Sequence, residues 1–236
     1  MTSNAYAILS RIVIYTLLIG GALVAWDELY YQYAVRPEMV RRLRLELVAR
    51  ALQQYAAEHG HLPPLHDENG KRYPISWRVH LLPLLGYKEL YEQFHLDEPW
   101  NSPHNLTLVS RMPTVFAYTV PGDEESQQGK TRLVAVIGQG SRWQEATQIT
   151  MTAERLLVVV GPPGNEVVWT APDDWDLDHP PRSKGEQSAD GDMLIGILDN
   201  CHTIYGRTIA ENITWNELIA RGAIIGVDNI VESRSR

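Results

Sequence analysis

An uncharged apolar run near the N-terminus constrains this chain more than any other feature. The run extends from Ile12 to Trp26, and residues 5–10 continue it backwards across Arg11. About 20 apolar residues cross a bilayer core, and an arginine at the end of a span can place its charge at the interface. We therefore expect residues 1–36 to form a transmembrane anchor and a juxtamembrane segment. A cleaved signal peptide and a buried helix of a soluble protein are the alternatives.

The charges that flank this run give conflicting indications of its orientation. Arg11 on one side and Asp27 and Glu28 on the other favour a cytoplasmic N-terminus. More positive charge follows on the C-terminal side, at Arg36, Arg41, Arg42 and Arg44. These arginines lie well beyond the run and belong to the helix expected next, so we give them less weight. We expect a single-pass membrane protein whose C-terminal domain is extracytoplasmic, in the periplasm or at the cell surface.

Composition excludes several classes of partner and site. The chain has 236 residues, and 29 acidic against 21 basic side chains give a net charge of −8. Lysine and arginine supply most of the affinity for a phosphate backbone, so we expect no nucleic-acid partner. Cys201 is the only cysteine. It can form no intramolecular disulfide, and it rules out a zinc site built from two or more thiolates.

The segment after the apolar run has the pattern of an amphipathic helix. Apolar residues recur at spacings of three and four from Val40 to Tyr55, after Pro37 and before Gly60. Shorter helical patterns follow at residues 77–85 and 87–94. A third begins with Ser102 as N-cap and Pro103 as first residue, and reaches about Arg111.

Beyond residue 114 the pattern changes to short strands. Six runs rich in Val, Ile and Leu are bounded by Gly, Pro and Asp, at residues 115–120, 132–137, 155–160, 166–169, 193–198 and 202–208. They predict one antiparallel sheet. Thr214 and Glu217 have the spacing of a capping box, which predicts a last short helix ending at Gly222.

The middle of the chain carries a dense motif, which includes the run Asp97-Glu98-Pro99-Trp100-Asn101-Ser102-Pro103-His104-Asn105. This motif resembles that of the family called domain of unknown function 1559. The resemblance to the family covers about residues 45–222 of the chain. Tyr55, Gly60, Pro63 and Pro64 upstream fit the end of the family's helix, and residues 168–174 and 198–218 fit its C-terminal motifs. The signature residues are Trp77, Arg78, Pro83, Asp97, Glu98, Pro99, Trp100, Ser102, Pro103, His104, Asn105 and Asp199.

The resemblance implies a pilin-like or pseudopilin-like architecture. Members of this family, which is abundant in planctomycetes, usually join a pilin-like N-terminal helix to a mixed extracytoplasmic domain. Nothing between Met1 and Arg11 resembles a prepilin cleavage motif, so we expect an uncleaved anchor. The expected fold is α+β: the anchoring helix continues into the amphipathic helix, which packs on a mostly antiparallel sheet with short helices. We expect the pilin-like domain at residues 37–226 and a flexible tail at residues 227–236.

One acidic loop has a spacing that suggests a cation site. Asp174, Asp176 and Asp178 alternate like the first oxygen ligands of a calcium loop. Such a loop needs glycine at its sixth position, where this chain has His179, followed by Pro180 and Pro181. We therefore expect a solvated acidic loop and no metal, with calcium as the alternative.

Histidines near the end of the amphipathic helix form a second candidate metal site. His59, His61 and His66 lie close together in sequence, beside Asp67 and Glu68. Imidazole and carboxylate groups are ligands for divalent metals. A protonated His59 in the last helical turn would interact favourably with the negative end of the helix dipole. We prefer this structural interpretation to a metal site.

The sequence offers no strong candidate for a catalytic centre. Gly138-Gln139-Gly140-Ser141 lacks the strand–turn–helix context of a nucleophile elbow, and prolines 162 and 163 remove donors that a phosphate loop needs. We expect a non-enzymatic membrane-anchored protein, without a cofactor, that acts in surface assembly or ligand presentation through self-association or pilin-like partners. The alternative is an extracellular carbohydrate- or peptide-binding module that uses Trp77, Trp100 and Trp143 as stacking faces. A hydrolase is the third possibility.

Overall fold

The computed structural model describes residues 36–65, 72–118, 129–141, 143, 155–181, 193–198, 203–208 and 214–224. The chain divides into two compact units, Met1–Leu43 and Arg44–Arg236. The anchor expected at residues 1–36, Arg36 excepted, and the tail expected at residues 227–236 lie outside the described residues. In the parts of the chain that are described, none of the helices has both the length and the apolar sequence of a membrane span.

The amphipathic helix is present as α2, Arg36–His59. Gly60 follows it with a φ of 78°, a left-handed conformation that glycine adopts without strain and that commonly ends helices. Within the second unit, Leu45, Val48 and Leu52 are fully buried and lie on one face of the helix. The three- and four-residue spacing of apolar residues predicted the helix, but its buried face only in part. Val48, Ala51, Leu52 and Tyr55 are buried as that spacing indicates, whereas Leu43 and Leu47 are exposed.

Short helices follow α2, and they are shorter than the sequence patterns indicated. The elements are α3 (Trp77–His80), α4 (Lys88–Tyr91), α5 (Pro103–Leu106) and the 3-10 helices η2 (Val109–Arg111) and η3 (Thr114–Phe116). Ser102 caps α5 by accepting a hydrogen bond from the backbone N–H of Asn105, and Pro103 is its first residue, as predicted. The strand predicted at residues 115–120 is wrong, because η3 occupies its start. Residues 119 and 120 lie outside the described residues.

The described strands form two sheets instead of the single antiparallel sheet that we expected. A small sheet pairs β1 (Lys130–Thr131) with β4 (Val167–Val168). The main sheet has the order β5-β2-β3-β6-β7. Its strands are β2 (Leu133–Ile137), β3 (Leu156–Val160), β5 (Trp175–Asp176), β6 (Met193–Leu198) and β7 (Thr203–Thr208). All neighbours in it are antiparallel except β5, which runs parallel to β2 and makes the sheet mixed.

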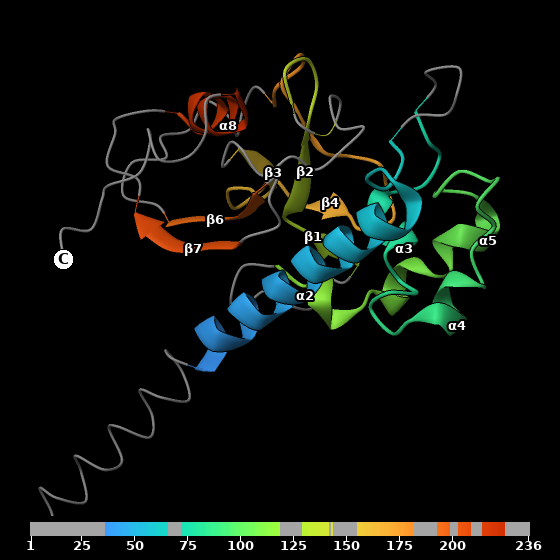
Figure 1. Cartoon of the computed structure of the whole chain (residues 1–236). Helices are drawn as coiled ribbons and strands as arrows, with labels where there is room; N and C mark the ends of the chain where they lie inside the picture. The colour runs from blue at the N-terminus through green and yellow to red at the C-terminus, as the bar shows by residue number, and fades with distance from the viewer. Residues whose placement is uncertain are drawn as a thin grey trace, which may run out of the picture. The chain divides into compact units, whose positions relative to one another are not determined.

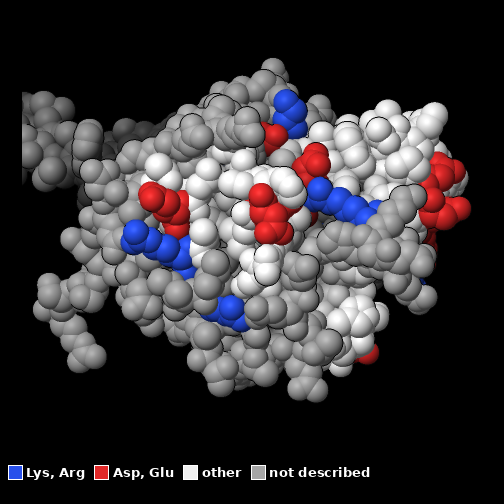
Figure 2. Space-filling model, turned by 90° about the horizontal axis from the view of Figure 1, so that it is seen from above, with Lys and Arg blue, Asp and Glu red and all other residues white. Residues whose placement is uncertain are grey.

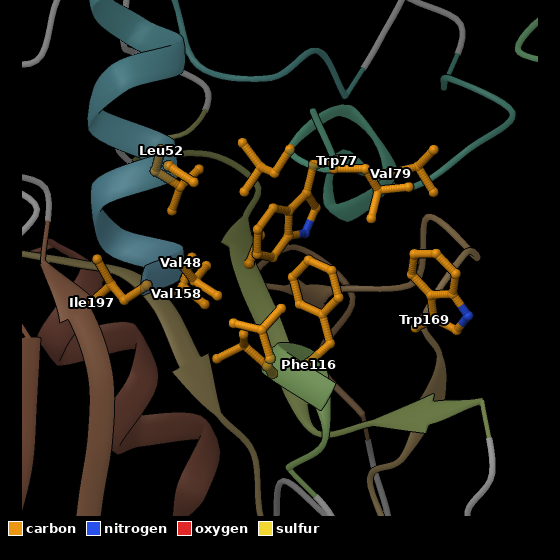
Figure 3. Packing of buried hydrophobic residues seen from close by; sticks show 14 of the residues in the cluster. Val48, Leu52, Trp77, Val79, Phe116, Val158, Trp169 and Ile197 are labelled. Carbon is orange, nitrogen blue, oxygen red and sulfur yellow. The ribbon is translucent and has the colours of Figure 1, made fainter. Parts of the chain in front are cut away.

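The main sheet is covered on both faces, which explains the nearly continuous apolar sequences of β2 and β3 (Figure 1). Leu133, Ala135 and Ile137 of β2 pack in a cluster with α2 and α3, whereas Val134 and Val136 pack in a second cluster. The second cluster also contains Trp215, Leu218 and Ile219 of α8 (Trp215–Ile224). Figure 3 shows how Val48 and Leu52 of α2 lie near Trp77, Phe116 and Val158.

The last helix begins as the sequence predicted. The backbone N–H of Thr214 donates to Glu217 at 3.0 Å, and the N–H of Glu217 donates back to the Thr214 hydroxyl at 3.3 Å. These two bonds satisfy donors that a helix start otherwise leaves open. The helix continues two residues beyond the predicted end at Gly222.

Candidate functional site

The signature residues of the motif gather in two places in the structure. Trp77 and Arg78 begin α3 and are fully buried. Residues 97–105 form the turn that leads into α5, and most of its side chains are exposed or half-buried. Pro83 is exposed in the turn after α3, and Asp199 lies outside the described residues.

The first place is a buried ion pair between Arg78 and Asp174. The Nη2 atom of Arg78 lies 3.0 Å from Oδ1 of Asp174, and neither side chain has any exposed surface. Arg78 also donates to the carbonyl of Leu133 from Nε at 2.9 Å and from Nη2 at 2.6 Å, and to the Ser76 hydroxyl from Nη1 at 2.6 Å. Its guanidinium carbon lies 4.8 Å from the centre of the Trp77 ring.

Asp174 is held by donors from two different elements. Its Oδ1 atom accepts hydrogen bonds from Nε1 of Trp77 at 3.0 Å and from the backbone N–H of Ala135 at 2.9 Å, in addition to Arg78. Its Oδ2 atom is buried and has no hydrogen-bond partner among the described residues. Further hydrogen bonds are needed to offset the cost of burying the two charges of an ion pair. On Asp174, the hydrogen bonds from Trp77, Ala135 and Arg78 all go to Oδ1.

The ion pair takes the place of a neighbouring strand along part of β2. On this edge β5 pairs only with Val136 and Ile137. Before these two residues in β2, the carbonyl of Leu133 accepts a hydrogen bond from Arg78, and the backbone N–H of Ala135 donates one to Asp174. Backbone groups that are buried without partners cost free energy, so the two side chains complete the hydrogen bonding of β2 where the strand ladder stops.

Burial disfavours the charged forms of both partners. It lowers the pKa of the Arg78 guanidinium, and Asp174 opposes this shift by its charge and its hydrogen bond. It raises the pKa of the Asp174 carboxyl, opposed by the charge of Arg78 and by the donors of Ala135 and Trp77. Both groups are enclosed and hydrogen-bonded, and Oδ2 of Asp174 alone of their atoms has no partner among the described residues. The pair therefore joins α3 to the sheet and has no surface on which to receive a substrate.

The second place, the turn at residues 97–105, is organised by the buried side chain of Asn105. Its Oδ1 atom accepts from the backbone N–H of His95 at 3.1 Å. Its Nδ2 atom donates to the carbonyls of His95 at 3.0 Å and Pro99 at 3.1 Å. The backbone N–H of Trp100 donates to the carbonyl of Pro74 at 2.8 Å, which ties the turn to the segment before α3. Trp100 itself is half-buried against the main core cluster.

Two exposed imidazoles lie on the surface of this turn. The rings of His95 and His104 stack with centroids 3.7 Å apart and an angle of 4° between their planes. Nδ1 of His95 lies 2.9 Å from Oε1 of Glu98, and Nε2 of His104 lies 2.7 Å from the carbonyl of Gln93. Hydrogen bonds from Ser102 and His95 lower the pKa of Glu98. Because the lone pairs of parallel stacked rings do not converge on one point, this pair does not form a metal site.

The acidic loop is not uniformly solvated, and the expectation was wrong for Asp174, which faces Arg78 in the core. Asp176 accepts from the N–H of Asp178 at 2.9 Å, and Asp178 accepts from the N–H of Gln139 at 3.0 Å. Gly138 has a φ of 102°, and a Cβ atom there would lie 3.0 Å from both of these carboxylates. The loop thus closes on a glycine turn, and the three aspartates do not point at a common centre.

The candidate histidine site is only partly described. His59 ends α2 as predicted, and its ring stacks on Tyr55 at 4.0 Å. Its Nδ1 atom lies 3.0 Å from the carbonyl of Tyr55, and Nδ1 of His61 lies 2.7 Å from the carbonyl of Leu62. His66, Asp67 and Glu68 are outside the described residues. Within the described ranges, no group of three His, Cys, Asp or Glu side chains is placed to hold a metal ion.

The tryptophans that the alternative hypothesis, a binding module, would use as stacking faces mostly lie in the core. Trp77 has no exposed surface and Trp143 is 7% exposed, so neither offers the stacking face that this alternative requires. Trp143 donates from Nε1 to the carbonyl of Pro63 at 3.2 Å. Trp100 alone of the three retains an accessible face.

Sequence reasoning missed the pairing of Arg78 with Asp174. Arg78 was singled out as a signature residue, but Asp174 was assigned to solvent because it alternates with two other aspartates. The flanking residues Ala171 and Trp175 gave the available indication, since both are apolar and both are buried in the structure. An aspartate between buried apolar residues is a candidate for a buried ion pair.

Comparisons with known proteins agree with the resemblance in sequence. The model of a family described as protein of unknown function (DUF1559) matches residues 43–159. Neither the curated proteins nor the solved structures gave a match. The matched region contains α2 from Leu43 on, the buried Trp77 and Arg78, and the turn organised by Asn105. The chain therefore belongs to the DUF1559 family.

Proposed function

We propose that this chain is a membrane-anchored, non-enzymatic, pilin-like protein whose extracytoplasmic domain acts in surface assembly or ligand presentation. The observation that carries the proposal is the position of α2 in the chain. From Leu45 onwards the helix packs on the main sheet, through Leu45, Val48 and Leu52. The uncharged apolar run Ile12–Trp26 precedes the same helix in sequence. A helix that follows an apolar run and packs on a sheet at its other end suits an anchored display domain.

The chemistry of the signature residues supports a non-enzymatic role. Arg78 and Asp174, the fully buried charged pair, are bonded to each other and to the backbone of β2. The side-chain amide of Asn105 is hydrogen-bonded to the backbone of His95 and Pro99. Groups committed in this way hold the fold together and are not free to bind or activate a substrate.

The described surface supports the expectation that nucleic acid is not a partner. On the face in Figure 2, acidic and basic side chains lie next to one another, without a continuous basic area among the described residues. The net charge of the chain is −8. A phosphate backbone is bound by clustered Lys and Arg, which this face does not offer.

Protease accessibility of a C-terminal tag on the full-length chain in intact cells tests the proposal. We expect the chain to sediment with membranes and the tag to be removed by added protease, while a cytoplasmic marker stays intact. Chemical cross-linking in the same cells should give ordered multimers. The matched variant replaces Leu17 and Leu18 by arginine, which costs about 3 kcal/mol per residue at the centre of a span. That variant should lose both membrane attachment and the multimers.

Two results would contradict the proposal. One is recovery of the uncleaved full-length chain entirely in the soluble fraction. The other is a membrane-bound chain whose tag is protected in intact cells and is cut only after permeabilisation, which would place the domain in the cytoplasm.

A further inference from the structure

Three imidazoles lie at the ends of α2 and α3 and in the turn that follows α2. His59 ends α2, His61 lies in the turn that follows, and His80 ends α3. The centroids of His59 and His61 are 6.2 Å apart, and His59 stacks on Tyr55. The His80 ring meets the Tyr73 ring edge-on, with centroids 5.9 Å apart and planes at 89°. The rings of Tyr55, His59 and His61 thus cluster at the end of α2, and the His80–Tyr73 pair at the end of α3 is close enough for the charge of His59 to act on His80.

His80 differs from the other two in its hydrogen bonding. His59 and His61 each place Nδ1 against a backbone carbonyl, at 3.0 Å and 2.7 Å. The Nε2 atom of His80 is buried and has no hydrogen-bond partner among the described residues. A proton added to this ring would create a charged donor whose buried end has nothing to bond to, which is costly in the interior.

Among the described residues, the groups around His80 would not compensate a positive charge on its ring. The described titratable groups that face it are the His59 imidazole from α2 and the Tyr73 phenol from the segment before α3. Tyr55 and His61 lie next to His59, and Tyr91 acts on Tyr55. Within the described residues, no carboxylate forms an ion pair with His80. Burial first, and then the charge of His59, lowers the pKa of His80 to about 4.

The contact that His80 makes also closes the connection between the helices. The backbone N–H of Tyr73 donates to the carbonyl of Leu65 at 2.8 Å. The same residue therefore bonds to the segment that follows α2 and contacts the His80 ring of α3. We propose that His80 is an acid-sensitive latch, closed while its imidazole is neutral and opened when Nε2 takes a proton from solvent. Opening would release α3 from Tyr73 and from the end of α2.

The direction and size of the effect follow from proton linkage. The ring has its ordinary pKa of 6.5 when released and a pKa of about 4 when closed, so the open state binds the proton more tightly. The closed state is therefore stable at neutral pH and loses stability as the pH falls below 6.5. Between about pH 7.5 and about pH 5, the linkage relation gives a rise in the opening constant of roughly 30-fold.

Hydrogen exchange of the full-length chain in detergent micelles, followed by mass spectrometry at these two pH values, tests the latch. After correction for intrinsic exchange rates, peptides spanning residues 52–62 and 73–82 should exchange about 30-fold faster at the lower pH. A peptide spanning β2 should not change in this way. In His80→Phe, which keeps a ring but takes no proton, the two pH values should agree. His95→Gln, which removes an exposed imidazole, should keep the full response.

Equal exchange of the wild-type chain at both pH values would overturn the proposal, as would an unchanged response in His80→Phe. If His80→Phe does not fold, NMR titration of the wild-type His80 ring decides. A neutral ring at about pH 5.5 is expected, whereas titration at its ordinary value would mean that the closed state accepts the proton and that there is no latch.

Discussion

Arg78 and Asp174 are 96 residues apart in sequence, and their side chains meet at 3.0 Å with no exposed surface on either. Each also bonds to the backbone of β2, Arg78 to the carbonyl of Leu133 and Asp174 to the N–H of Ala135. The pair thus connects α3, β2 and the segment that enters β5. Its importance lies in the backbone groups that it satisfies as much as in its own charge.

Replacing Asp174 by asparagine should destabilise the protein by about 3 kcal/mol, because the guanidinium of Arg78 would remain buried without a counter-charge. Urea unfolding followed by tryptophan fluorescence measures the change. The matched control is Glu92→Gln, which breaks the exposed Lys88–Glu92 pair at 3.7 Å. That variant should lose less than about 1 kcal/mol. Equal losses in the two variants would contradict this account of the buried pair.

Replacing both partners by apolar residues, as Arg78→Met with Asp174→Leu, tests the part played by the backbone. Buried ion pairs can often be replaced in this way without loss. Here we expect the double variant to remain about 2 kcal/mol less stable than the wild type, because the carbonyl of Leu133 and the N–H of Ala135 lose their partners. The same unfolding experiment applies. Wild-type stability in the double variant would show that charge alone explains the loss in Asp174→Asn.

Asn105→Ala should destabilise the protein by about 2 kcal/mol, since it leaves the N–H of His95 without a partner and removes one of the two donors to each of the carbonyls of His95 and Pro99. The change is read as a lower midpoint of thermal unfolding. Asn101→Ala is the control, because Asn101 lies exposed in the same turn and should change the stability by less than about 0.5 kcal/mol. A native-like midpoint for Asn105→Ala would mean that the turn forms without this amide.

Calcium should not stabilise the protein against heat. Asp174 is committed to Arg78, and Asp176 and Asp178 accept from backbone N–H groups of their own loop and of Gln139. Thermal unfolding in millimolar calcium, magnesium or chelator should give the same midpoint. A calcium-specific increase of the midpoint that disappears in Asp176→Asn would contradict this prediction and indicate a calcium site in the loop. A ligand at a hundredfold excess over its dissociation constant adds about 2.7 kcal/mol to the free energy of unfolding.

Local features of this protein were predictable from the sequence because they depend on neighbours in the chain. Apolar spacing predicted α2, and Gly60 its end. Ser102 with Pro103 predicted the start of α5, and Thr214 with Glu217 the start of α8. Helix caps and amphipathic faces are formed within a few residues, so their energetics can be read without knowing the rest of the fold.

The tertiary structure alone decided where the charged and aromatic side chains go. Asp174 alternates with two other aspartates as a solvated residue would, yet it is buried because Arg78 and Ala135 lie opposite it. Trp77 and Trp143 could equally have faced a ligand, but the packing of α2 and α3 on the sheet encloses them. Burial and ion pairing depend on which distant segments meet. Residues 78 and 174 meet only when α3 packs against β2, which no local pattern encodes.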